Sequence, residues 1–201
     1  MNIGAIVLAA GSSRRFNGDK RRSMLASGKS LLRTSIENAA SHFTQTLVVL
    51  RAEDQEYAEQ LGKQLNDLHV TFFCAPESAL GMAHSLGNAI SKIERWAAAA
   101  VFLGDMPYLK PETIETLLSA YDEHAKSQPI VVPVKAGNYG HPVIFDQLYF
   151  DAISSLKGDV GARAVIKEYS ERVLEVLVDD DGAIKDIDRS GDMPANKGRS
   201  D

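Results

Sequence analysis

Residues 8–20 read LAAGSSRRFNGDK and follow the apolar run 3–7 directly. Small side chains let a backbone approach a ligand closely, and successive N–H groups in such a turn can bind phosphate oxygens. Arg14, Arg15 and Lys20 add positive charge. The segment therefore predicts a loop that binds a triphosphate. The alternative is an ordinary turn between a strand and a helix, with its charged side chains in solvent.

The loop differs from two widespread phosphate-binding motifs. It lacks the Gly-x-x-x-x-Gly-Lys-Ser/Thr pattern of P-loops, and it lacks the Gly-x-Gly-x-x-Gly pattern of dinucleotide-binding folds. The second absence argues against a nicotinamide-dependent oxidoreductase.

A second segment whose residues could take part in a reaction reads LGDMP at 103–107. It follows the apolar run 99–103 and shares its last residue. An aspartate just past a buried strand, between Gly104 and Pro107, is well placed to hold a divalent cation. The alternative is that Asp105 only caps a helix or stabilises a turn. Ligands of open α/β sheets bind beyond the carboxyl ends of the strands. We therefore expect the loop and Asp105 to face one another across a single cleft.

Short apolar runs alternate with amphipathic segments, which predicts the elements that position these residues. The expected buried strands cover 3–8, 46–50, 70–74, 99–103 and 130–134. The expected helices between them cover 31–40, 54–68, 82–96 and 111–124. Later segments predict a turn-rich connection at 135–140, strands at 142–145 and 173–178, helices at 148–156 and 162–169, and an acidic turn at 179–182. This alternation predicts an α/β fold with a three-layer, doubly wound, mostly parallel sheet.

Composition narrows the class of protein. The chain has 201 residues, 44% of them hydrophobic, which suits one domain over 1–189 and a disordered tail over 190–201. The net charge of −5 argues against nucleic-acid binding. The single cysteine, Cys74, excludes an intrachain disulfide and a multi-cysteine metal site. We expect a cytoplasmic protein without a membrane span or signal peptide.

Six motifs, in order, resemble those of the MobA/MocA-like molybdenum-cofactor nucleotidyltransferases, within the wider sugar-nucleotidyltransferase superfamily. They are LAAGxSxRFxGDK at 8–20, GMAHSL at 81–86, LGDMP at 103–107, GHPVIF at 140–145, LKGDVGAR at 156–163 and KDID at 185–188. The resemblance covers nearly the whole chain. It implies a nucleotide-diphospho-sugar transferase (Rossmann-like) fold and an Mg²⁺-dependent enzyme that transfers a nucleotide to a phosphorylated small molecule and releases pyrophosphate.

The resemblance also implies roles for individual residues. It assigns nucleotide binding to Leu8, Ala9, Ala10, Gly11, Ser12, Ser13, Lys20, Gly81 and Ser85. It assigns catalysis to Arg15, Lys20 and Asp105, and binding of the acceptor to His141, Asp159 and Arg163. It assigns Mg²⁺ to Asp105 and Asp188, with Asp186 as the substitute for Asp188. The structural alternatives are a solvated Lys20, a histidine that only packs, and a capped helix at 158–163.

The variant LAAG and the later motifs favour the side of the family that uses CTP and molybdopterin, and a molybdoenzyme or accessory protein is a possible partner. Two features depart from the family pattern. The segment 21–29 inserts charge and polarity where the family runs directly from the lysine into Leu-Leu, and RSGD follows Asp188 where the family has TPED. The alternatives are a sugar or polyol phosphate as acceptor, or an accessory protein that binds nucleotide or cofactor without turnover.

Overall fold

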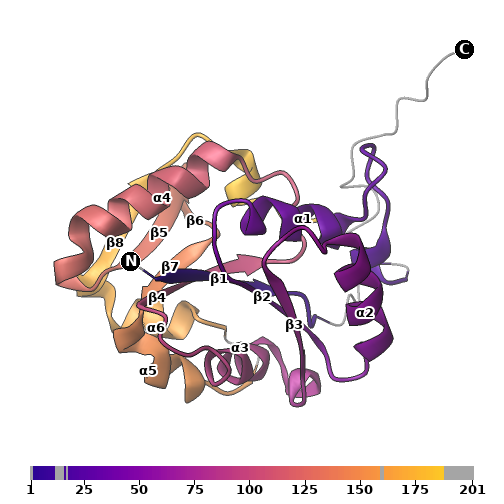
Figure 1. Ribbon diagram of the computed structural model, residues 1–201. Coiled ribbons are helices and arrows are strands. Elements are labelled where there is room, and N and C mark those ends of the chain that lie inside the picture. The colour runs from indigo at the N-terminus through magenta and orange to yellow at the C-terminus, as the bar shows by residue number, and fades with distance from the viewer. Residues whose placement is uncertain (1, 12–15, 17, 159–160, 188–201) are drawn as a thin grey trace, which may run out of the picture.

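A single eight-stranded sheet forms the centre of the molecule (Figure 1). The computed structural model describes residues 2–11, 16, 18–158 and 161–187. The strand order is β3-β2-β1-β4-β7-β5-β6, and β8 also pairs with β5. The strands are β1 (Ile3–Leu8), β2 (Thr46–Arg51), β3 (Val70–Ala75), β4 (Ala98–Leu103), β5 (Ile130–Lys135), β6 (Asn138–Tyr139), β7 (Val143–Asp146) and β8 (Val173–Leu177).

The sheet is mostly parallel, as the alternation of strands and helices predicts. Strands β3, β2, β1 and β4 run parallel to one another, and β8 runs parallel to β5. Strand β7 is antiparallel to both β4 and β5, and β6 is antiparallel to β5. Because β7 runs in the reverse direction, its first residues lie next to the carboxyl end of β4.

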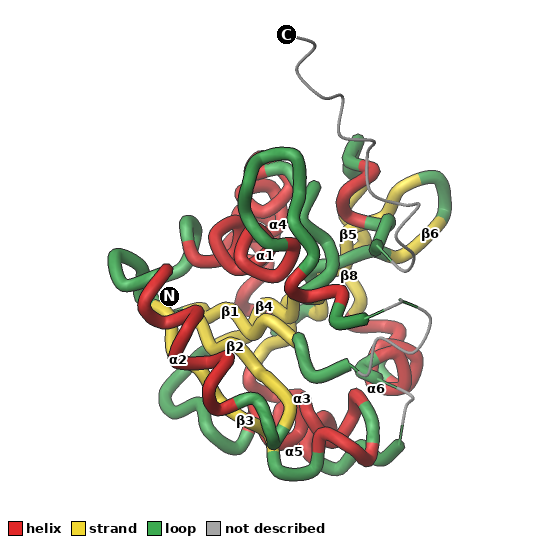
Figure 2. Tube along the Cα trace, turned by 90° about the vertical axis from the view of Figure 1, so that its right-hand side faces the viewer, coloured by secondary structure: helices red, strands yellow, loops and turns green. Residues whose placement is uncertain are grey.

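Helices cover both faces of the sheet, so the predicted three layers are confirmed (Figure 2). Helices α1 (Leu31–Ala40), α2 (Gln55–Gln64) and α4 (Pro111–His124) pack on the face that receives Ala5 and Val7 of β1. Helices α3 (Met82–Ile90), α5 (Phe150–Ser154) and α6 (Arg163–Glu168) pack on the face that receives Ile6 and Leu8. The alternation within β1 follows from the two-residue period of a strand, and it shows that β1 is buried on both sides.

Several elements differ from the prediction at their ends. Helices α1 and α4 have the predicted bounds, whereas α3 ends at Ile90 and not at residue 96. The apolar residues Ile93 and Trp96 continue the periodicity of α3 from a loop, and Trp96 is buried against the sheet with its indole N–H donating to Gln45 Oε1 at 2.9 Å. The connection at 135–140 contains the short strand β6, which was not predicted.

The ends of β1 and β4 lie against one another. The Gly104 N–H donates to the Leu8 carbonyl at 2.8 Å, and a Cβ on Gly104 would lie 2.9 Å from the Ala9 Cβ. Glycine at 104 therefore allows the turn after β4 to approach the turn after β1. None of the helices in the described part of the chain combines the length and the apolar character needed to cross a bilayer.

Candidate active site

An ion pair joins the two segments that the sequence analysis singled out. The Lys20 Nζ lies 2.6 Å from Asp105 Oδ2, although the two residues are 85 positions apart, and their side chains are 14% and 19% exposed. Lys20 begins the 3₁₀ helix η1 (Lys20–Arg22), and Asp105 follows β4. The loop after β1 and the turn after β4 therefore meet at the carboxyl edge of the sheet.

The Asp105 carboxylate is only partly satisfied. Its Oδ2 accepts from Lys20, whereas its Oδ1 is buried and has no hydrogen-bond partner among the described residues. A buried carboxylate oxygen without a partner is unfavourable, and a water molecule or an ion is a common partner for such an atom. A hard anionic oxygen is also the ligand that Mg²⁺ prefers. Asp105 therefore fits a divalent cation better than it fits a purely structural role.

The last described residues of the chain return to Asp105. The Ile187 N–H donates to the Asp105 carbonyl at 3.1 Å, and the Ile187 carbonyl accepts from Lys20 Nζ at 3.2 Å. Asp188, one of the two predicted metal ligands, lies outside the described residues, and its substitute Asp186 is exposed. Within the described ranges, no three histidine, cysteine or acidic side chains form a cluster for a metal ion. The second ligand thus stays a prediction.

The glycine-bearing loop continues directly from β1. Ala9 is buried, Ala10 is half-buried and Gly11 is exposed, so the chain moves towards the surface along these three residues. The Ala9 N–H still pairs with the Val49 carbonyl of β2 at 2.8 Å. Three further predicted residues of this loop, Ser12, Ser13 and Arg15, lie outside the described residues.

The start of α3 packs against the segment that precedes α6. Gly81 has a φ of +121°, a conformation that only glycine adopts without strain. The buried Ser85 donates from its hydroxyl to the Gly81 carbonyl at 3.3 Å, inside its own helix. The Ala83 N–H donates to the Gly158 carbonyl at 3.2 Å. Two predicted segments therefore meet here, although Asp159 lies outside the described residues.

His141 lies between β6 and β7, beside the carboxyl end of β4. Its Nδ1 is 3.3 Å from the Val101 carbonyl, and because a carbonyl only accepts, this nitrogen carries the proton. Burial lowers the pKa of His141, and the charge of Asp105 opposes that effect only in part. His141 is therefore neutral at pH 7, with Nε2 as its acceptor. Arg163, the exposed first residue of α6, adds a positive charge that also acts on His141.

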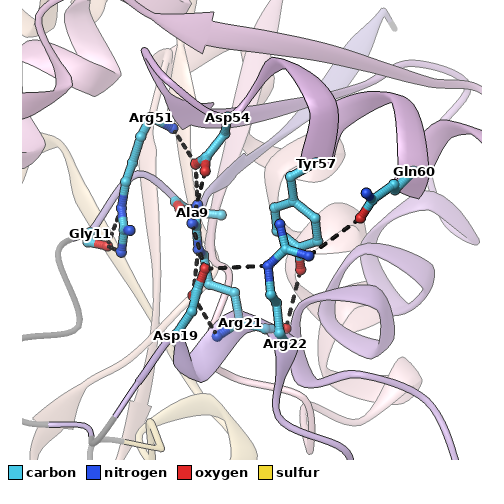
Figure 3. Close-up of polar contacts among 9 residues, drawn as sticks. All are labelled: Ala9, Gly11, Asp19, Arg21, Arg22, Arg51, Asp54, Tyr57 and Gln60. Atoms are coloured by element: carbon cyan, nitrogen blue, oxygen red, sulfur yellow. Dashed lines mark hydrogen bonds and ion pairs between the residues drawn. The ribbon is translucent and has the colours of Figure 1, made fainter.

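Sequence reasoning missed the buried residue next to Lys20. Arg21 was counted with the charged residues of 21–29, yet it is 4% exposed and pairs with Asp19 and Asp54 (Figure 3). Asp54 follows the end of β2, the strand beside β1, so its place beyond a strand end was the available signal. The predicted acidic turn also needs a correction. Asp180 is buried and accepts from Lys110 N, Thr113 Oγ1 and Gly182 N, so it joins this turn to the start of α4.

Comparisons with known proteins agree with this architecture. Residues 5–173 match the family described as MobA-like NTP transferase domain. The purine catabolism protein PucB of Bacillus subtilis (strain 168) is 26% identical over 194 residues, covering 91% of this chain and 90% of PucB. A probable molybdenum cofactor guanylyltransferase of Thermococcus kodakarensis is 36% identical over 142 residues, covering 70% of this chain and 63% of that protein.

A solved structure has the same fold over most of the chain. Rv0371c of Mycobacterium tuberculosis H37Rv superposes with a TM-score of 0.75 at 25% identity, covering 96% of each chain. A second structure of Rv0371c, a complex with manganese, gives a TM-score of 0.68 at 23% identity and covers 89% of each chain. Together with the matched residues 5–173, these findings show that the chain belongs to the MobA-like NTP transferase family and is an enzyme of the nucleotidyltransferase type.

Proposed function

We propose that this enzyme transfers CMP from CTP to the phosphate of molybdopterin and releases pyrophosphate. The observation that carries the proposal is the Lys20–Asp105 pair, in which one carboxylate oxygen is paired at 2.6 Å and the other is buried without a described partner. The pair lies directly beside the small-residue loop after β1. A site that binds a metal-bound triphosphate needs these components: a backbone that admits phosphate, a cation, and a carboxylate for the metal.

The chemistry requires positioning and neutralisation of charge more than a covalent nucleophile. An oxygen of the acceptor phosphate attacks the α-phosphorus of CTP, and the bond to the β-phosphate oxygen breaks as pyrophosphate leaves. Lys20 exchanges its contact with Asp105 for contacts with the triphosphate, where its charge stabilises the transition state. Arg15 adds a second positive charge, and the backbone of 8–13 holds the nucleotide.

Asp105 and Asp188 are the proposed ligands of Mg²⁺, with Asp186 as the substitute for Asp188. The contacts of Ile187 support this assignment, because they hold the residue before position 188 against the Asp105 backbone and the Lys20 ammonium. When bound, the cation neutralises triphosphate charge. Manganese, which is bound in a structure of Rv0371c, is the second metal to test.

The acceptor is proposed to bind on the side of His141 and α6. Neutral His141 can take a hydrogen bond at Nε2 from a protonated phosphate or a pterin N–H, and Arg163 supplies a positive charge for the phosphate. Asp159 is the third residue that we propose to bind the acceptor. CTP and molybdopterin rest on the LAAG, GHPVIF and LKGDVGAR motifs. The relative from Thermococcus kodakarensis is named a guanylyltransferase, so GTP is the main competing donor.

The test is pyrophosphate release with each of CTP, GTP, ATP and UTP, in Mg²⁺ and in Mn²⁺. The acceptors are molybdopterin, a sugar phosphate and a polyol phosphate. We expect release with CTP and molybdopterin. Release with another nucleotide and acceptor would show that the proposed substrates are wrong and that the proposed reaction type is right. CTP binding in calorimetry without release from any pair would support the accessory protein, for which the RSGD sequence after Asp188 is the motivating feature.

A further inference from the structure

The Arg21 guanidinium, next to the proposed site, has many hydrogen bonds within the protein. An arginine side chain has five N–H donors. In Arg21, Nε donates to Asp19 Oδ1 at 2.8 Å, and the two Nη2 bonds reach Asp19 Oδ2 at 2.7 Å and Asp54 Oδ1 at 3.1 Å. Nη1 donates to Asp54 Oδ2 and, at 3.0 Å, to the Ala9 carbonyl. All five donors are used within the protein, so Arg21 has none left for a phosphate.

These bonds fix the backbone at the start of the glycine-bearing loop. The Ala9 carbonyl points to Arg21 at 3.0 Å (Figure 3). In a trans peptide, the carbonyl and the following N–H point in opposite directions. The N–H of Ala10 therefore faces away from Arg21, and Ala10 is only half-buried. One residue later, the Gly11 carbonyl accepts from Arg51 Nε at 3.0 Å.

Asp54 couples the two arginines. Its Oδ2 accepts from Arg21 Nη1 and also from the Arg51 backbone N–H at 3.0 Å. The two carbonyls of the loop are thus tied to one carboxylate at the end of β2. Burial works against the charge of Arg21, but the hydrogen bonds to Asp19 and Asp54 raise its pKa above the ordinary value. The group is therefore charged at pH 7.

The same contacts set the direction of Lys20. Asp19 precedes η1 and accepts from the Arg21 N–H at 3.2 Å, and the Tyr57 hydroxyl donates to the Arg21 carbonyl at 3.3 Å. Successive residues of a 3₁₀ helix point about 120° apart, because three residues make one turn. When Arg21 is held inward between two aspartates, Lys20 is turned towards Asp105.

We propose that Arg21, Asp54 and Arg51 form a positioning clamp for the nucleotide loop, a role that rests on the proposed function. Arg21 touches no substrate. It turns the Ala9 carbonyl away from the nucleotide and places Lys20, while Arg51 holds the Gly11 carbonyl. A lysine keeps the charge but lacks the planar fork of five donors, so Arg21→Lys removes the geometry specifically.

The experiment measures kcat and both KM values for the wild type, Arg21→Lys and the control Arg22→Lys, together with CTP affinity by calorimetry. Arg22 belongs to the same helix but is half exposed, with its guanidinium over the Tyr57 ring. We expect Arg21→Lys to lower kcat/KM for the nucleotide by about 10²-fold, because small displacements of reacting groups have effects of that size. The KM for the acceptor and all constants of Arg22→Lys are expected to stay unchanged.

The split between the two KM values separates positioning from simple loss of fold. Partial unfolding would lower kcat in proportion to the folded fraction and leave both KM values unchanged. If Arg21→Lys does not fold, Arg51→Met is the second variant, because it removes the bond to the Gly11 carbonyl without changing a buried group. We expect Arg51→Met to raise the KM for the nucleotide and to leave the KM for the acceptor unchanged. Nucleotide constants equal to those of Arg22→Lys, in the variant that folds, would overturn the clamp while the wild type remains active. A wild type that binds none of the four nucleotides would overturn the proposed function and the clamp together.

Discussion

Lys20 and Arg21 are neighbours in the chain, and the side chain of each forms an ion pair with aspartate, yet their surroundings differ. Arg21 uses every donor it has, on two carboxylates and one carbonyl. Lys20 pairs with a carboxylate whose second oxygen is buried without a described partner. A fully satisfied buried network stabilises one geometry and loses energy when it is opened, whereas a partly satisfied one gains from a ligand. The difference supports the proposed division, in which Arg21 belongs to the framework and Lys20 takes part in the reaction.

The largest expected effect comes from Asp105→Asn. It removes the charge that pairs with Lys20 and the proposed metal ligand while changing the volume little. We expect pyrophosphate release to fall about 10³-fold or more, because a metal ion contributes several kcal/mol to the transition state. Initial rates and the melting temperature are measured side by side, with the exposed Asp122→Asn as control. A rate close to that of the control would remove Asp105 from the mechanism.

Lys20→Ala is expected to have the next largest effect. If Lys20 stabilises charge in the transition state, kcat falls by about 10²–10³-fold. The matched control is Lys63→Ala, at an exposed position of α2, which should not change the rate. Activity in Lys20→Ala equal to that in the control would show that the pair with Asp105 is structural, and the contrast with Arg21 would then disappear.

Asp54→Ala tests the framework side of the comparison through stability. Breaking a buried pair costs about 3–5 kcal/mol, and we expect about 2 kcal/mol here because Asp19 still pairs with Arg21. The exposed neighbour Glu53→Ala should change the free energy of unfolding by less than about 0.5 kcal/mol. Urea denaturation of both variants measures the difference. Equal stabilities would mean that Asp54 contributes nothing to the clamp.

The smallest expected effect is on the free energy of unfolding at acidic pH. Burial favours the neutral form of Asp19, but its hydrogen bonds with Arg21 outweigh burial and hold the pKa of this carboxyl below its usual value. A carboxyl with a lowered folded pKa stabilises the fold above its unfolded pKa, about 3.9, and loses that contribution as the pH falls through the folded pKa. The wild type should therefore exceed Asp19→Asn in stability at pH 6, by a margin that shrinks below pH 4. Urea curves at pH 6, 4 and 3 measure it. A margin independent of pH would show that the charge of Asp19 is not involved.

Local patterns predicted the fold well where one element depends on its own residues. Helices α1 and α4 have the predicted bounds because their apolar residues recur with the helical period and their first residues suit a helix start. The period failed in α3, where Trp96 returns to the core from a loop. It also missed β6, whose two residues pair only with β5. Trp96 is held by residues distant in the sequence, such as Gln45, and local periodicity does not record such contacts. The hairpin of β5 and β6 is local, but two residues are too few to show the period of a strand.

In the candidate site too, residue types were predictable from the sequence, whereas burial and pairing were not. The types of the residues at 8–20 and at 105 were sufficient to predict phosphate and metal chemistry, because few other roles suit small residues, a lysine and an aspartate after buried strands. Arg21 and Asp180 look equally polar in the sequence, yet both are buried and paired. Burial of a charged residue depends on which carboxylate or donor the fold brings to it, and its own neighbours in sequence do not reveal that.

The sequence by itself determined the chemical types at the strand ends and the alternation of strands and helices. From these it predicted a layered α/β protein and proposed a phosphate-binding loop. Only the tertiary structure decided that Lys20 meets Asp105 while Arg21 turns inward to Asp54. The physical reason is the strand order. Because β1 lies between β2 and β4, the two basic side chains that follow its loop find one carboxylate on each side. That order is fixed by packing across the whole sheet, and no single segment contains it.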